Sequence, residues 1–143
     1  MASRTDLRLA LGVLTGLWVT VGAAVPVGYV VLRALKRANG GTLGPELLEG
    51  PGVVLTLLAA YGVAAAIGGW AAGWVAIENR RILTALLATL HAGTSLFVVA
   101  AELSPLEPGI TLSLAAAAVL GTIAGVSVRA WQVGRWSRTA MAE

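Results

Sequence analysis

The sequence predicts an all-α integral membrane protein, a four-helix bundle whose consecutive helices run up, down, up and down across the bilayer. Two observations predict this class. Of the 143 residues, 57% are hydrophobic and 12% are charged, whereas an average soluble domain carries roughly 25% charge. The apolar residues are also gathered into four long runs that contain no Asp, Glu, Lys or Arg. This composition excludes an ordinary soluble globule and a disordered chain.

Each apolar run is long enough to cross the hydrocarbon layer as a helix. We expect helices rather than barrel strands, because the runs do not alternate apolar and polar residues and because lipid offers the backbone no water to bond. A single membrane domain then takes residues 1–143. The predicted spans lie near residues 9–32, 52–77, 82–101 and 110–128, and a short cytoplasmic tail covers 129–143.

Short polar segments separate the runs. Asn39-Gly40-Gly41 predicts the end of an extended first helix. Residues 46–49 are expected to add one helical turn at the membrane surface. The charged segment 78–81 predicts a tight turn, so the second and third helices should form an antiparallel hairpin. The tail, where arginines and tryptophans alternate, is expected to continue the last helix into or along the headgroup layer, in contact with acidic phospholipids.

The basic residues predict how the chain is oriented. With both termini on one side, that side carries seven arginines and the other side carries three basic residues. The excess predicts that both termini are cytoplasmic. The alternative is a cleaved signal peptide ending near residues 21–23, which would leave three helices. The seven are Arg4, Arg8, Arg80, Arg81, Arg129, Arg135 and Arg138, against Arg33, Lys36 and Arg37.

Small residues recur at spacings of three and four along the second helix, from Ala59 to Ala76. Such spacing lets a neighbouring helix backbone approach closely, and membrane helices pack by these contacts. Two interpretations stay open: packing within the chain, or a docking face for another copy or another subunit. The predicted helix-packing residues are Gly12, Gly16, Gly62, Ala66, Gly69, Gly73, Gly121 and Gly125.

His91 is the only ionisable residue well inside an apolar run, and it shares a helix face with Ser95. An intramembrane ionisable group is a functional candidate. His91 can ligate haem, contact a quinone or relay a proton. A bis-histidine haem would need its second histidine from a partner or another copy, because the chain has one His. The simpler interpretation is a hydrogen bond to a hydroxyl on a facing helix.

The sequence predicts a non-catalytic protein. It contains no cysteine and no phosphate-binding loop, metal-ligand cluster or nucleophile–base pair. We therefore expect no metal, no resident cofactor and no nucleic-acid partner, but contacts with the lipid bilayer and with other membrane subunits or further copies. Two alternatives stay open: a channel or holin-like permeation protein, and a haem- or quinone-contacting subunit of a redox complex.

The segment 68–90, GGWAAGWVAIENRRILTALLATL, and the glycines of the fourth run resemble the YrzE-like group of small four-helix bacterial membrane proteins. The shared features are a glycine pair, an Ala-Gly step, a short charged turn and a long apolar third helix. The resemblance covers the second to fourth helices. It implies four spans and a bacterial cytoplasmic membrane, and it brings no established activity.

Overall fold

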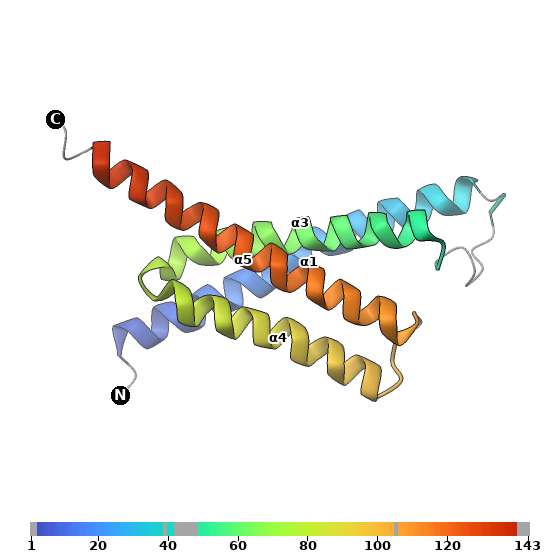
Figure 1. The fold of residues 1–143 in the computed structure, drawn as a ribbon, viewed down its shortest axis with the longest axis horizontal. Coiled ribbons are helices and arrows are strands. Elements are labelled where there is room, and N and C mark those ends of the chain that lie inside the picture. Colours follow the sequence, from blue (N-terminus) through green and yellow to red (C-terminus); the bar gives the residue numbers. More distant parts are fainter. Residues whose placement is uncertain (1–2, 39, 42–48, 105, 140–143) are drawn as a thin grey trace.

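The computed structural model describes residues 3–38, 40–41, 49–104 and 106–139 of the chain, and these residues form helices and no strand. This confirms the all-α class. The helices and the connecting 3-10 turn are α1 (Arg4–Ala38), α3 (Pro51–Ala76), η1 (Ile77–Asn79), α4 (Arg80–Ala100) and α5 (Pro108–Thr139), as Figure 1 shows.

Within the described residues, three helical stretches are long and apolar enough to cross a membrane, which indicates a membrane protein. The middle stretch combines α3 and α4, and η1 turns the chain back between them, so that the two helices run in opposite directions (Figure 1). The start of α1 and the end of α5 lie at the same end of the molecule in that view. The three stretches are Arg4–Ala38, Pro51–Ala100 and Pro108–Arg135.

The first helix is longer than its predicted span at both ends. Ser3 and Asp6 cap its start reciprocally: the Ser3 N–H donates to the Asp6 carboxylate (2.9 Å) and the Asp6 N–H donates to Ser3 Oγ (3.2 Å). At its end, Gly40 and Gly41 adopt φ of 65° and 96°. The Gly41 N–H then bonds the Lys36 carbonyl (2.8 Å), as glycines beyond a helix end commonly do.

The last helix also exceeds its predicted span. The apolar run ends at residue 128, and α5 continues to Thr139, so residues 129–139 extend this helix, as the sequence predicts for the tail. Hydropathy marks only the portion of a helix that suits hydrocarbon, whereas the backbone keeps its hydrogen bonds beyond that portion. Of the helical turn expected at residues 46–49, residues 46–48 lie outside the described residues.

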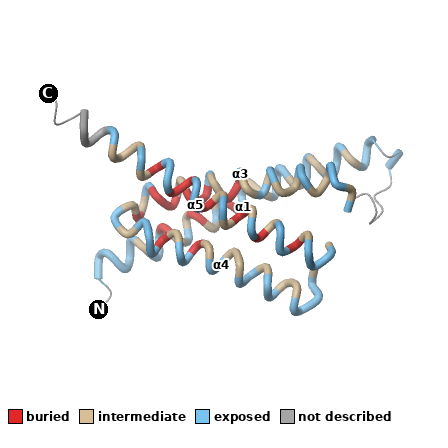
Figure 2. Tube along the Cα trace, in the orientation of Figure 1, coloured by how far each residue is buried: buried red, intermediate tan, exposed pale blue. Residues whose placement is uncertain are grey.

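The core is built mainly from small side chains around α3. This helix packs against α1 and α5, and α4 packs mainly against α5. Figure 2 shows the buried residues gathered where the helices cross. The largest fully buried side chains are Leu83, Leu87 and Thr122. A cluster of Ala72, Ala76, Leu83, Leu87 and Val126 ties α3, α4 and α5 together, and Leu9, Val13 and Leu17 of α1 pack on it.

Candidate functional site

Helix α1 meets α3 through glycine. A Cβ added at Gly12 would lie 2.8 Å from Cβ of Ala76, and one at Gly16 would lie 3.0 Å from Cβ of Ala72. From the other side, a Cβ on Gly68 would collide with Thr20 Oγ1 and the Gly16 carbonyl. The Thr20 hydroxyl is itself bound, since it donates to the Gly16 carbonyl (2.8 Å). Close backbone approach at this crossing therefore requires the three glycines.

Helix α5 meets the adjoining face of α3 still more closely. A Cβ at Gly121 would strike the Gly62 carbonyl, and one at Gly125 would strike the Ala66 carbonyl. A Cβ at Gly69 would lie 2.6 Å from the Thr122 carbonyl. Because these neighbours are backbone atoms, no side-chain rotation relieves the contact. All eight residues predicted for helix packing thus lie at or beside a contact within the chain.

The single stripe predicted on α3 is divided between two faces. Gly62, Gly69 and their neighbours face α5, whereas Ala76 faces α1 and Ala59 is exposed. The residue that sequence reasoning missed is Gly68. It belongs to a second series of small residues at a spacing of four, Ala64, Gly68, Ala72 and Ala76, and all four are buried in the structure. The spacing is the signal in the sequence that could have indicated this second face.

Some other glycines within the helices face open space instead. Among them, a Cβ at Gly22 or Gly28 of α1, or at Gly93 of α4, would meet nothing within 4 Å. The packing described above gives no reason for glycine at these positions.

Arg129 is a buried cation, which the prediction of a cytoplasmic tail starting at this residue did not anticipate. Only 7% of the residue is exposed. Its aliphatic part packs on Gly73, where an added Cβ would lie 3.0 Å from Cγ of Arg129. Its guanidinium carbon lies 3.5 Å from the centre of the Trp74 ring, within the range of a cation–π contact. Glycine at position 73 makes room for this arginine between α3 and α5.

Trp70 of α3 makes a second contact with α5 beside Arg129. Its indole N–H donates to the Gln132 side-chain oxygen (3.0 Å). Its ring meets that of Trp74 edge to face, with centroids 5.7 Å apart and an angle of 79°. We call Trp70, Trp74, Arg129 and Gln132 the tryptophan–arginine cluster. It joins α3 to α5 at the end of the molecule where α1 begins (Figure 1).

His91 and Ser95 are half-buried on α4. The Nε2 atom of His91 is shielded from solvent and has no hydrogen-bond partner in the described part of the chain. No hydrogen bond joins it to Ser95 among those residues. Across the same residues, no group of three His, Asp or Glu side chains is arranged to hold a metal ion. His91 therefore stays a candidate polar site without a ligand set of its own.

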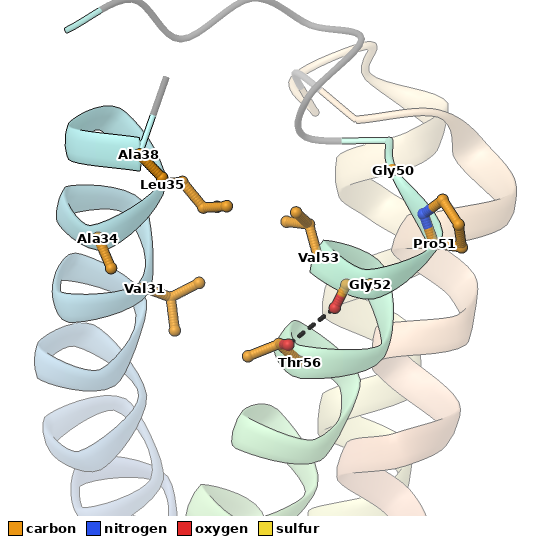
Figure 3. Close-up of a pocket in the computed structure, with 9 residues that line it drawn as sticks. All are labelled: Val31, Ala34, Leu35, Ala38, Gly50, Pro51, Gly52, Val53 and Thr56. Atoms are coloured by element: carbon orange, nitrogen blue, oxygen red, sulfur yellow. Dashed lines mark hydrogen bonds between the residues drawn. The ribbon is translucent and has the colours of Figure 1, made fainter. Parts of the chain in front are cut away.

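An apolar recess separates α1 from α3 at the opposite end of the molecule (Figure 3). Its volume is about 580 Å³. Among the described residues that line it, Thr56 carries the one polar side chain, and its hydroxyl already donates to the Gly52 carbonyl (2.7 Å). These residues offer no free polar side chain that would select a ligand. The side chains that line it are Val31, Ala34, Leu35, Ala38, Pro51, Val53 and Thr56.

Together these features define an all-helical protein with three stretches able to span a membrane, held together by glycine contacts and by a buried arginine. No family model, curated protein or solved structure matches the chain. The resemblance to the YrzE-like group stays a prediction.

Proposed function

We propose that the chain is a non-catalytic, multi-pass protein of the bacterial cytoplasmic membrane that acts by packing against other membrane subunits or further copies of itself. In this proposal α1, α3, α4 and α5 each cross the bilayer, in an up-down-up-down bundle with both termini cytoplasmic. The glycine contacts of α1, α3 and α5 hold the chain together, so its outer surfaces are those available to a partner.

The observation that carries the proposal is Gly93. It lies in the middle of α4, its face of the helix is exposed, and a Cβ there would meet nothing in the chain. A glycine in a helix interior costs about 1 kcal/mol relative to alanine. Several glycines inside the chain, such as Gly69 and Gly125, lie where another backbone comes close. A helix from a second chain approaching α4 at Gly93 would give the same reason for glycine at this position.

The first test is the mass of the native particle. The protein is extracted from its own membranes in a mild detergent and measured by native mass spectrometry. A complex with larger subunits, or a defined homo-oligomer, is the expected result. A homo-oligomer then leads to a flux measurement in liposomes, which tests the channel hypothesis. A haem band that His91→Ala removes would favour the redox hypothesis. A monomer free of other proteins, extracted under several mild conditions, would refute the proposal.

Cysteine cross-linking then tests the face of α4. The chain has no cysteine, so each variant carries one thiol. Gly93→Cys should form disulfide-linked dimers in membranes if α4 meets α4 of a second copy. Ala116→Cys is the control, because it is exposed and lies eight residues from the start of α5, whereas Gly93 lies seven from the end of α4. Equal cross-linking at both positions would indicate random collision.

A further inference from the structure

A lateral groove of about 900 Å³ lies between α4 and α5, at the end of the molecule where α4 begins. Figure 1 shows the two helices separating towards that end. The groove exists because the facing side chains are small: Ala85 and Ala88 on α4, and Ser127, Ala130 and Gly134 on α5. Larger side chains at these positions would close it.

The two walls are held apart by contacts elsewhere. Buried Leu83 and Leu87 turn α4 towards α1, where they lie beside Gly12 and Gly16. Gly125 and Arg129 fix α5 against α3. Neither helix can move to fill the groove without breaking its own contact.

The mouth of the groove is positively charged. Arg80 and Arg81 line it, and both are exposed. The acid in the same turn, Glu78, pairs with Arg8 (3.5 Å). No Asp or Glu lines the groove in the part of the chain that the structure describes.

The opposite wall ends in an aromatic and cationic pair. Trp131 lines the groove, and the guanidinium carbon of Arg135 lies 4.6 Å from the centre of its ring. Tryptophan and arginine are typical of the headgroup layer. The charged mouth therefore lies where lipid headgroups would lie if α4 and α5 cross the bilayer.

The length of the groove suits one leaflet. From Arg80 to Ala88 the helix rises about 12 Å, at 1.5 Å per residue. Half of a bilayer's hydrocarbon layer is about 15 Å thick. Beyond the arginines the lining becomes apolar, with Ala88, Ile123 and Val126 at the deeper end. A charged end and an apolar end at this separation match the phosphate and an acyl chain of a single lipid.

We propose that this groove binds one anionic glycerophospholipid of the cytoplasmic leaflet, with its phosphate at Arg80 and Arg81 and an acyl chain along Ala85 and Ala88. The proposal rests on the membrane insertion and orientation given under Proposed function. It does not depend on Gly93 or on any protein partner.

The test is native mass spectrometry of the full chain in a non-ionic detergent. The protein is offered phosphatidylglycerol and phosphatidylcholine with identical acyl chains, and the ratio of the two bound lipids is measured. Wild type should retain phosphatidylglycerol preferentially. Arg80→Gln/Arg81→Gln should weaken its binding by about tenfold or more, because each arginine near an anionic lipid contributes about 1 kcal/mol. Arg33→Gln/Arg37→Gln, which removes the same charge at the opposite end of α1, should keep the preference.

A second pair of variants tests the groove itself. Ala88→Leu fills it without changing charge and should reduce the bound phosphatidylglycerol, whereas Ala116→Leu on an exposed position of α5 should not. Circular dichroism and a monodisperse elution establish that each variant is folded. Equal retention of the two lipids, equal loss in the two double-arginine variants, or full binding by folded Ala88→Leu would each overturn the proposal. A particle that assembles with partners but shows no lipid preference overturns the groove alone.

Discussion

Gly125 illustrates what a single residue decides in this protein. Its neighbours across the α3–α5 contact are the Ala66 carbonyl and the Trp70 amide nitrogen, both backbone atoms. Gly125→Ala must therefore push the helices apart, and we expect it to lower the free energy of unfolding by about 1–3 kcal/mol. The measurement is an SDS titration from mixed micelles, followed by circular dichroism.

Gly22→Ala is the control for this substitution. Gly22 also lies inside a helix, but an added Cβ there meets nothing. Because alanine has the higher helix propensity, we expect Gly22→Ala to leave stability unchanged or to raise it by up to about 1 kcal/mol. If the two variants lose stability equally, the α3–α5 contact is not as close as described.

The contact between Arg129 and Trp74 makes a second prediction at the same scale. Arg129 is buried although Trp74 is 52% exposed, so the difference from an exposed pair comes from the cation. A cation–π contact with a desolvated cation is worth about 2 kcal/mol, and an exposed one about 0.5–1 kcal/mol. A double-mutant cycle with Arg129→Gln and Trp74→Leu should thus give a larger coupling energy than the matching cycle on the exposed pair. The matching cycle uses Arg135→Gln and Trp131→Leu. A coupling no larger than that of the exposed pair would contradict the arrangement described for Arg129.

The sequence predicted the residues of these sites better than their pairing. Glycine spacing marks a helix that another backbone can approach, and it identified Gly69, Gly121 and Gly125. It does not say which helix approaches, because a small residue leaves the same space for any neighbour. Arg129 was placed in the tail because charge is expected outside lipid. The combination that shelters it, Gly73 beside Trp74, exists only once α3 and α5 cross.

At the scale of the element, α4 is held to the rest of the chain by two leucines. Leu83 and Leu87 are almost fully buried, whereas Leu86 and Leu90 of the same helix are 41% and 40% exposed. Leu83→Ala/Leu87→Ala should lower the free energy of unfolding by at least about 2 kcal/mol, because the cavities lose dispersion contacts even in lipid. Leu86→Ala/Leu90→Ala removes the same atoms and should cost much less, as SDS titration of both variants will test.

The helices themselves follow from composition, but their ends do not. Each apolar run lies largely within a helix, because a segment in lipid must satisfy its backbone hydrogen bonds internally and a helix does so. The ends of α1 depend instead on local chemistry: the Ser3–Asp6 cap and the positive φ of Gly40 and Gly41. Hydropathy does not detect a cap, so the predicted first span began five residues after Arg4.

At the scale of the whole molecule, charge and helix direction favour the same orientation. The start of α1, η1 and the end of α5 lie at one end (Figure 1), which gathers the arginines there. The opposite end of α1 carries Arg33, Lys36 and Arg37. These cations oppose the orientation but suit a helix C-terminus, whose carbonyls favour positive charge. Arg33 also lies 5.9 Å from the Tyr29 ring centre, a contact typical of a headgroup layer.

The proposed orientation, with both termini cytoplasmic, leads to the last prediction. Single cysteines test it in intact bacterial cells. Thr5→Cys and Asn79→Cys should resist a membrane-impermeant maleimide until the cells are opened, whereas Ala101→Cys, in the turn after α4, should react at once. The prediction rests on the excess of arginines at the end that holds Thr5 and Asn79, which is expected to face the cytoplasm. Immediate labelling of Asn79→Cys with protection of Ala101→Cys would show the inverted topology, in which the cluster at Arg33, Lys36 and Arg37 decides the orientation. Neutralising that cluster should then restore the predicted pattern of labelling.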